Sequence, residues 1–397
     1  MLFNHFTIVH PSLHFVGGAE RLMTDLALGL ADAEIQVEVV TGMCHDYWRS
    51  QLSKKANCVS VKELGRATPG NLRFWLGAKG FAGAFAKLIN PETDLILTSS
   101  FPSSLIADLF TKRHDVKTVH YLHEAPMVLH DREGLKTLPL KLRMFYRFAS
   151  ARYAKDDVEA VRRSNMILAN SQFTRKVNAV TYGVDESSIG VIYPGVNVEQ
   201  LTASAVKPHL ISKYVRDGLP VILFPRGAQF WRNPEVCLQA LQRLRIGDFV
   251  AVFTGGADYE ASALLKRAKM LGLTGKVVWV QELSDEELNA MYSRSSLVVS
   301  IPKRQPFGLI PLEALVCGAP PIISRSSGVA EVLRDGVDAI CVNESDSEQL
   351  TGAIETLILD AGIRAKIVSN GKQRVLAKFT SGRFVKEVIE ALSKLAS

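Results

Sequence analysis

The sequence predicts an α/β protein made of two doubly wound, Rossmann-like domains whose parallel sheets face each other across a cleft. The chain has 397 residues, which is enough for two or three domains of ordinary size. Short apolar runs alternate with amphipathic helical patterns in both halves, as right-handed β-α-β units require. Hydrophobic residues make up 47% and charged residues 22% of the chain, a composition typical of globular rather than disordered proteins.

In the first half, the pair Gly17-Gly18 separates a first strand from a helix in which Leu22, Leu26 and Leu30 share one face. The further strands are short apolar runs. The predicted elements of this half are a strand at 6–10, a helix at 19–30, and strands at 35–40, 94–98, 117–122 and 165–169.

The second half repeats the alternation. Asn233 is expected to cap a helix that has Pro234 in its first position, and the stretch from Ser284 to Glu287 has the pattern of a capping box. The predicted strands are 221–224, 249–253, 277–280, 297–301 and 321–324; the predicted helices are 234–244, one opening at 284, 311–316, and the chain beyond 345.

The predicted domains follow from this order. Residues 1–205 are expected to form an N-terminal domain and 206–375 a C-terminal domain; the stretch 200–219 has little pattern and connects them. The last segment, 376–397, is expected to form a helix that packs back on the N-terminal domain.

The net charge of +7 is concentrated in one segment. Between Arg132 and Lys176 the chain has eleven basic and four acidic residues, so this segment accounts for the whole excess. The rest of the chain is neutral, which excludes a protein that is basic over its entire surface.

Five scattered cysteines without a Cys-x-x-Cys pair exclude a disulfide framework and a zinc knuckle, and no Asp-x-Asp motif follows an apolar strand. We therefore expect no metal and no other cofactor. No apolar run of 18 residues is present, and the first ten residues fit a strand better than a signal peptide. The expected location is the cytoplasm, or the periphery of a membrane on its cytoplasmic face.

Two strand ends of the first half carry candidate ligand-binding groups. Gly17 and Gly18 leave backbone N–H groups at a helix start open to an anion, although paired glycines also form plain tight turns. His123 directly follows the strand at 117–122. Its imidazole suits a ligand hydroxyl or phosphate, and the alternative is a histidine that serves the structure alone.

Two arginines follow the first strand of the second half. Arg226 and Arg232 come just before a helix that opens at Pro234. Forked guanidinium donors and the positive end of a helix are what a diphosphate requires. The alternative is a pair of ordinary surface arginines.

The loop after the strand at 297–301 is the most informative motif. It reads Gln305-Pro-Phe307-Gly308-Leu309 and leads into a helix that carries Glu313. A carboxylate there can accept both hydroxyls of a ribose, while backbone amides of the loop contact phosphate or sugar.

Taken together, these motifs resemble those of the retaining GT-B glycosyltransferases of family 4, and within them the Alg2-like mannosyltransferases. The opening Val9-His-Pro-Ser with Gly-Gly-Ala-Glu-Arg21 is similar to that group's opening, and Pro306-Phe-Gly-Leu-Ile-Pro-Leu-Glu-Ala314 is similar to its signature. The segments at 170–174 and 191–196 are similar to its domain-end motifs.

The resemblance places the acceptor side in the N-terminal domain, 1–205, and donor binding in the C-terminal domain, 206–375. It also implies a role for each candidate residue. Arg226 and Arg232 would neutralise the leaving diphosphate, and His123 would line the donor sugar. Glu313 would hold the ribose. The other donor-binding residues would be Gln305, Phe307, Gly308, Leu309, Gly17 and Gly18.

The implied function is transfer of a hexose, mannose from GDP-mannose being favoured, to a glycan or a lipid-linked oligosaccharide at a membrane surface. Gln305 stands where the family signature has the first of its two glutamates, and Arg232 where a lysine is usual. The alternatives are a non-catalytic subunit that binds a sugar nucleotide, a GT-B enzyme that uses a UDP-sugar, and an epimerase of the same fold.

The basic segment contains a predicted amphipathic helix at 139–163. Leu140, Met144, Phe148 and Ala151 follow helical spacing, Leu142 and Phe145 widen the apolar face, and Lys141, Arg143, Arg147 and Arg152 lie between them. This pattern favours an anionic membrane surface. The alternative is a helix packed on its own domain with solvated basic residues. No nucleic-acid-binding module accompanies the charge, so we expect no nucleic-acid partner.

Overall fold

The computed structural model describes residues 3–14, 17–65, 72–123, 127–130, 140–204 and 208–395. It divides into two compact units: unit 1 comprises Met1–Pro194 and Ser381–Ser397, and unit 2 comprises Gly195–Thr380. The predicted boundary at 205 falls on residues outside the described ranges, and the division lies before it. The segments 132–139 and 124–126, which contain part of the basic segment and of the His123 motif, also lie outside the described ranges.

Unit 1 is built on a parallel sheet of seven strands in the order β3-β2-β1-β4-β5-β6-β7. The strands are β1 (His5–Val9), β2 (Gln36–Thr41), β3 (Val59–Glu63), β4 (Leu95–Thr98), β5 (Lys117–Leu122), β6 (Met166–Ala169) and β7 (Ile189–Val191). The helices are α1 (Gly18–Asp32), α2 (Asp46–Ser53), α3 (Leu72–Ala86), α4 (Ser103–Thr111), α5 (Met127–His130), α7 (Leu140–Arg162), α8 (Gln172–Tyr182) and α16 (Ser381–Ser393).

Alternation along β1 explains why helices cover both faces of this sheet. Phe6 and Ile8 point to one face, where they join a core formed with α1 and α16. Val9 points to the other face, where its core partners come from α3, α4 and α7. Successive side chains of a strand face opposite sides, so a strand buried on both faces reads as a continuous apolar run.

Unit 2 has a parallel sheet of six strands in the order β10-β9-β8-β11-β12-β13. The strands are β8 (Val221–Phe224), β9 (Val250–Thr254), β10 (Val277–Val280), β11 (Leu297–Ser300), β12 (Pro321–Ser324) and β13 (Ile340–Val342). The helices are α9 (Val198–Ser204), α10 (Pro234–Arg243), α11 (Asp258–Met270), α12 (Asp285–Arg294), α13 (Ile310–Cys317), α14 (Ser347–Leu359) and α15 (Ala361–Lys378). The doubly wound, two-domain prediction is therefore confirmed.

Several details differ from the sequence prediction, which did not specify the helices α2, α3, α4, α8 and α11. The strands β3, β7 and β13 were not predicted, and α9 together with a short 3-10 turn at Pro208–Leu210 occupies part of the stretch that showed little pattern. Asn233 does not cap α10 through its side chain, because its Nδ2 atom donates to the carbonyl oxygen of Ile301 at 2.7 Å. The capping box at Ser284 and Glu287 is present.

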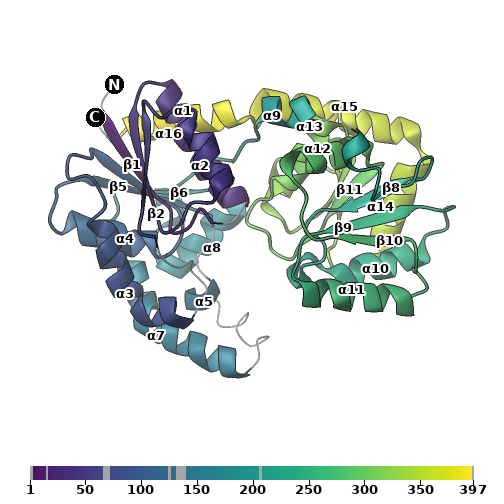
Figure 1. Cartoon of the computed structure of the whole chain (residues 1–397), viewed down its shortest axis with the longest axis horizontal. Helices are drawn as coiled ribbons and strands as arrows, with labels where there is room; N and C mark the ends of the chain where they lie inside the picture. The colour runs from purple at the N-terminus through teal and green to yellow at the C-terminus, as the bar shows by residue number, and fades with distance from the viewer. Residues whose placement is uncertain are drawn as a thin grey trace. The chain divides into compact units, whose positions relative to one another are not determined.

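The last helix, α16, returns to unit 1 and packs on α1 (Figure 1). Its side chains Phe384, Val388 and Leu392 are buried in the same core as β1. The ring of Phe384 also lies edge-on to that of Tyr121 in β5, with centroids 5.6 Å apart. The first and last parts of the chain therefore share one hydrophobic core. In the described part of the chain, no helix is both long and apolar enough to cross a membrane.

Candidate functional site

Each sheet has one point at which the order of its strands reverses, and ligands of doubly wound folds bind beside the carboxyl ends of the strands there. In unit 1 the reversal lies between β1 and β4, and in unit 2 between β8 and β11. The predicted site residues of unit 2, Arg226 and Gln305, follow β8 and β11. His123 of unit 1 follows β5, the neighbour of β4.

Arg226 lies in a tight turn directly after β8. Its φ of 56° is left-handed, a conformation that costs a non-glycine residue free energy. The turn is held by a hydrogen bond from the Arg226 backbone N–H to Thr254 Oγ1 at 2.9 Å. The Arg226 side chain is exposed. The strained backbone therefore presents the guanidinium at the carboxyl end of the sheet.

Arg232 is half-buried six positions further on. Its Nη1 atom donates a hydrogen bond to Gln305 Oε1 at 2.7 Å, so the structure brings two of the predicted site residues together. Its Nε atom is buried and has no hydrogen-bond partner among the described residues. Burial and the neighbouring charge of Arg226 lower the pKa of Arg232 to about 10, which leaves it a cation at neutral pH.

The loop from Gln305 to Leu309 is fixed by backbone contacts. The N–H of Gly328 donates to the Gln305 carbonyl at 2.9 Å, and the N–H of Val329 donates to the Phe307 carbonyl at 3.1 Å. Gly308 has a φ of 103°, which side chains rarely tolerate. Leu309 is the N-cap residue of α13, and Phe307 is buried.

Glu313 lies in the first turn of α13, among neighbours that are buried and apolar. Its carboxylate is half-buried and accepts a hydrogen bond from the Tyr292 hydroxyl at 3.0 Å. A carboxylate near a helix N-terminus is stabilised by the helix dipole and keeps further lone pairs for hydroxyl donors. The geometry is compatible with the ribose-binding role that the resemblance implies.

In unit 1, Gly17 is the N-cap residue of α1 and Gly18 its first residue. Gly17 has an ordinary extended backbone, with φ −130°, so the glycine is not needed for its conformation. A Cβ atom at this position would collide with the carboxylate of Glu20. The lack of a side chain at Gly17 therefore makes room for Glu20, and the contact of Gly17 and Gly18 with the donor stays a prediction.

His123 has a buried Nε2 atom with no hydrogen-bond partner among the described residues. Burial, with the nearby His10, lowers the pKa of His123 to about 4. The imidazole is therefore neutral at physiological pH. A neutral imidazole with one unused nitrogen can bind a hydroxyl, and it offers no charge to a phosphate.

Sequence reasoning missed the residues around His123. His10 Nδ1 lies 2.5 Å from Ser99 Oγ, and His10 Nε2 lies 3.8 Å from Glu20 Oε1. His10 and Ser99 each follow an apolar strand, as His123 does. That shared position after neighbouring strands is the signal that could have identified them.

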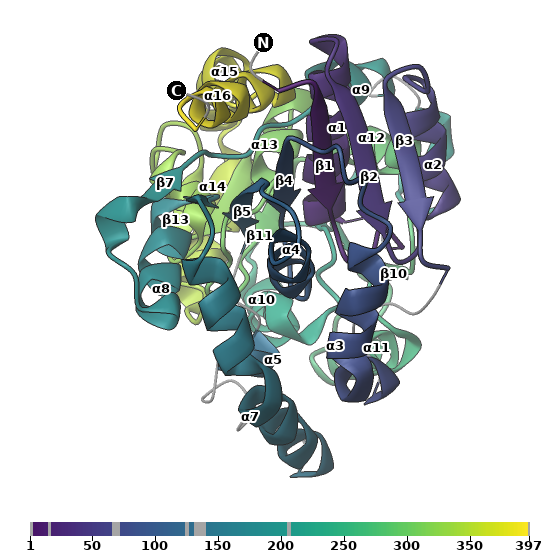
Figure 2. The ribbon, with the colours of Figure 1, turned by 90° about the vertical axis from the view of Figure 1, so that its left-hand side faces the viewer.

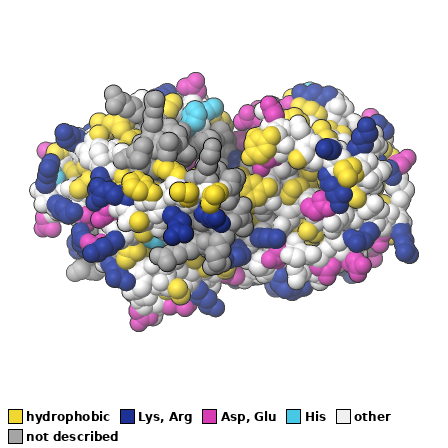
Figure 3. Space-filling model, turned by 90° about the horizontal axis from the view of Figure 1, so that it is seen from below, with side chains coloured by type: hydrophobic (Ala, Val, Ile, Leu, Met, Phe, Trp, Pro, Cys, Tyr) yellow, Lys and Arg dark blue, Asp and Glu magenta, His cyan; other side chains and the backbone are white. Residues whose placement is uncertain are grey.

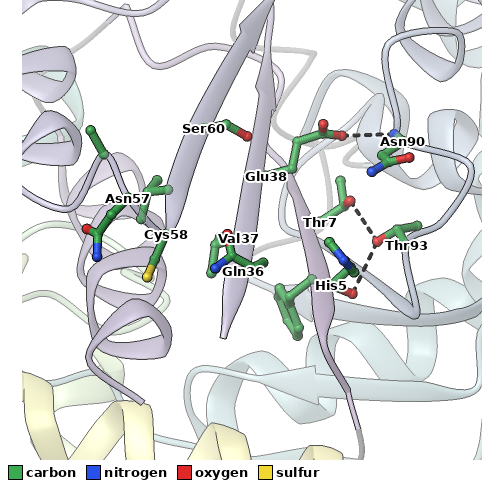
Figure 4. Close-up of a pocket in the computed structure, with 13 residues that line it drawn as sticks. His5, Thr7, Gln36, Val37, Glu38, Asn57, Cys58, Ser60, Asn90 and Thr93 are labelled. Atoms are coloured by element: carbon green, nitrogen blue, oxygen red, sulfur yellow. Dashed lines mark hydrogen bonds between the residues drawn. The ribbon is translucent and has the colours of Figure 1, made fainter. Parts of the chain in front are cut away.

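Unit 1 also has a polar pocket of about 210 Å³ at the opposite, amino-terminal edge of its sheet (Figure 4). Its polar groups bind one another: Thr7 and Thr93 share a hydrogen bond of 2.8 Å, and Glu38 accepts from the Asn90 backbone at 3.0 Å. None of the predicted site residues lines it. Within the described ranges, no group of three or more His, Cys, Asp or Glu side chains is arranged to hold a metal ion.

Comparison with known proteins agrees with this geometry. Residues 16–200 match the model of "Glycosyltransferase Family 4", and residues 208–374 match that of "Glycosyl transferases group 1". The chain is 25% identical to the human alpha-1,3/1,6-mannosyltransferase ALG2, over 98% of this chain and 95% of that protein. It is 24% identical to a D-inositol 3-phosphate glycosyltransferase of Salinispora arenicola, over 97% of this chain and 89% of the relative.

Solved structures show the same fold. A glycosyltransferase of Rickettsia africae superposes with a TM-score of 0.77 at 19% identity, covering 98% of each chain. The Anabaena protein Alr3699/HepE, solved with UDP and glucose, has a TM-score of 0.76 at 18% identity and covers 98% of this chain and 99% of its own. The two family matches adjoin and span most of the chain, and the chain therefore belongs to the GT-B glycosyltransferases that join a family 4 domain to a group 1 domain.

Proposed function

We propose that this protein is a retaining hexosyltransferase that moves mannose from GDP-mannose to a glycan or lipid-linked oligosaccharide at a membrane surface. The observation that carries the proposal is the cation pair of unit 2. Arg226 is exposed, and Arg232 is half-buried beside the strand reversal, with an Nε–H that has no acceptor among the residues the structure describes. A nucleoside diphosphate leaving group gains negative charge in the transition state, which such a pair stabilises.

The relatives support the choice of donor sugar. The human relative is named as a mannosyltransferase, and GDP-mannose is the donor that the resemblance favours. Each charge-assisted contact that strengthens in the transition state is worth about 2.7–4 kcal/mol when it resembles an oxyanion-hole donor. The two arginines are thus sufficient for a large part of the rate enhancement without a metal.

The test is transfer itself. Purified full-length protein is incubated with GDP-mannose and a panel of glycan and lipid-linked acceptors, and the products are identified by mass spectrometry. The anomeric configuration is read by NMR. We expect an α-linked mannosyl product from this α-configured donor; a β-linked product would contradict retention.

Two alternatives make different predictions. Gln305 replaces a signature glutamate, which favours a non-catalytic subunit; such a protein would bind the sugar nucleotide and yield no product with any acceptor. The structure of Alr3699/HepE contains UDP and glucose, which favours a UDP-sugar donor. Transfer from UDP-glucose but not from GDP-mannose would establish the latter.

A surface on α7 supports the membrane part of the proposal. Leu140, Met144 and Phe148, four residues apart, are 61%, 64% and 53% exposed. The half-exposed Arg143 and exposed Arg147 lie on the same turns. An exposed apolar stripe flanked by arginine is the pattern of a helix that enters the interface of an anionic membrane.

The opposite face of α7 is anchored in unit 1. Ala149 and Tyr153 are buried, and Asp157, 1% exposed, accepts hydrogen bonds from Ser104 Oγ at 2.6 Å and His130 Nε2 at 2.8 Å. The first half of α7 extends away from the sheet (Figure 2). Seen from that end, hydrophobic side chains of unit 1 lie next to lysine and arginine (Figure 3). The helix is thus held firmly while its apolar stripe remains uncovered by the described residues of unit 1.

Flotation with liposomes tests this surface. Lys141, Arg143 and Arg147 are changed to Glu, and we expect binding to vesicles with anionic lipid to fall at least tenfold, since each basic residue contributes about 1 kcal/mol. The matched control changes the exposed Lys266, Lys269 and Lys366 of unit 2 to Glu. Equal binding by both variants and the wild type would contradict the proposal.

A further inference from the structure

Three neighbouring strands of unit 1 are each followed by a polar residue at the carboxyl edge of the sheet, and the one after β5 lies two positions beyond the level of the other two. His10 follows β1, Ser99 follows β4 and His123 follows β5. The register pairs Val9 of β1 with Thr98 of β4. The next residues, His10 and Ser99, therefore lie side by side between these two strands, where the strand order reverses. This is the edge at which a doubly wound sheet binds its ligand.

Glu20 completes this cluster from the first turn of α1. Its Oε1 atom lies 3.8 Å from His10 Nε2, and the other ring nitrogen of His10 is 2.5 Å from Ser99 Oγ. His10 is thus held between Ser99 and Glu20, with 4% of its side chain exposed. Gly17 leaves the space that the Glu20 carboxylate occupies.

The Glu20 carboxylate has unused hydrogen-bonding capacity. Its side chain is only 15% exposed, and its Oε1 atom approaches His10 Nε2 at 3.8 Å. Further polar neighbours are its own backbone N–H, which donates to the carboxylate, and His123. Burial by itself raises the pKa of Glu20, but His10, the backbone N–H of Glu20 and His123 together outweigh burial, so the net pKa is lowered. A carboxylate offers about four acceptor positions, so these contacts leave positions that the donors of a ligand can occupy.

We infer that Glu20 accepts a hydrogen bond from a sugar hydroxyl, with His10 as its positioning residue. The Nε2 atom of His123, which has no partner within the described ranges, is a neighbouring contact. The inference rests on the proposed function and adds a specificity-determining residue to it. A hydroxyl is the ligand group that fits. It can donate a hydrogen bond to the Glu20 carboxylate, and it can also donate to or accept from the Nε2 atom of His123. A phosphate is excluded at this point, because the ionised Glu20 would repel it.

The hydroxyl has two sources, the hexose of the donor and the acceptor glycan, and steady-state kinetics of the full chain distinguish them. The KM values for donor and acceptor are measured for the wild type, Glu20→Gln and Glu20→Asp, with thermal unfolding as the check of folding. Glu92→Gln is the matched control, since Glu92 is an exposed carboxylate of the same unit.

Loss of a charge-assisted hydrogen bond predicts a rise in one KM of about ten- to a hundredfold in Glu20→Gln. Glu20→Asp keeps the charge and should recover part of the loss. A rise in acceptor KM assigns the hydroxyl to the acceptor. A rise in donor KM, with inhibition by the free nucleoside diphosphate unchanged, assigns it to the donor hexose. If Glu20→Gln behaves like Glu92→Gln, or if the affinity for the nucleoside diphosphate falls equally, the inference is overturned.

A protein that transfers no sugar would refute the proposed function but still test Glu20. Calorimetry then compares the binding of GDP-mannose, GDP and methyl α-mannoside to the wild type and to Glu20→Gln. Selective weakening of the sugar-bearing ligands supports the inference, and identical affinities of the two proteins overturn it.

Discussion

Arg232 shows how a single residue can be held ready for an anion. Its Nη1 atom is engaged by Gln305 at 2.7 Å while its buried Nε atom has no partner among the described residues. A neutral amide orients the guanidinium without neutralising it, whereas a glutamate at the same position would form an ion pair with it. The exchange of the signature glutamate for Gln305 therefore leaves Arg232 with its full charge.

Removal of that charge should slow the chemical step. We expect Arg232→Ala to lower kcat about 10²- to 10³-fold, as loss of one oxyanion-hole donor does. The matched control is Arg245→Ala, because Arg245 is an exposed arginine of the same unit. Initial rates at saturating donor measure the effect. A kcat within threefold of the wild type would show that Arg232 does not act on the leaving group.

Gly17 and Glu20 should behave as one functional element. A methyl group at Gly17 would displace the Glu20 carboxylate, so Gly17→Ala is expected to raise the same KM as Glu20→Gln. Because both changes remove one interaction, the double variant should be little worse than either single one. A double-mutant cycle measures this, and additive effects would show that Gly17 acts independently of Glu20.

At the scale of elements, sequence reasoning found the strands that have a compact apolar run, and β8, β10, β12 and β5 have the predicted bounds. β8 and β12 are buried along their whole length, whereas β10 is a half-buried edge strand whose residues are all apolar. The three strands that it missed are also at sheet edges; β7 and β13 have only three residues each, and β3 has half-exposed residues. An edge strand is covered on fewer sides, so its sequence needs less apolar character.

In the candidate site, too, some features could be predicted from the sequence and others depend on the tertiary fold. Sequence motifs identified Arg232, Gln305 and His123, because a loop after a strand has a visible pattern. The contacts of Glu20 could not be predicted, since they depend on a histidine ten positions away and on Ser99, which follows a strand much later in the chain. Only the strand order places those residues together.

The docking of α16 should contribute strongly to the stability of unit 1. Phe384 is fully buried in the core shared with β1, so Phe384→Ala should lower the free energy of unfolding by about 3–5 kcal/mol. The control is Leu376→Ala in α15, where the side chain is 45% exposed and the expected loss is below about 0.5 kcal/mol. Urea denaturation followed by fluorescence measures both, and equal losses would contradict the burial of α16.

At the scale of the whole molecule, titratable groups are distributed unevenly. Eight of the nine histidines belong to unit 1. Burial lowers the pKa of His120 and of His123 to about 4, whereas an unfolded histidine titrates near 6.5. Between these values the unfolded chain binds more protons than the folded one, so acid favours unfolding.

Unit 1 should therefore lose stability selectively as the pH falls. The contribution of His120 is fully present above pH 6.5 and decreases toward pH 4, by on the order of 2 kcal/mol at pH 5. Differential scanning calorimetry at pH 7, 6 and 5 should show the transition of unit 1 moving down while that of unit 2 moves less. His120→Gln should flatten this dependence, and an unchanged slope would exclude His120 as its source.

The chain passes between the units twice, at Pro194–Gly195 and at Thr380–Ser381, and the second passage has a consequence for biosynthesis. α16 leaves the ribosome only after every residue of unit 2, yet it supplies Phe384, Val388 and Leu392 to the core of unit 1. The unit that begins first must therefore wait for the other before its core is closed. During translation, the uncovered apolar surface of α1 is exposed to chaperones and to neighbouring nascent chains for the time needed to synthesise unit 2.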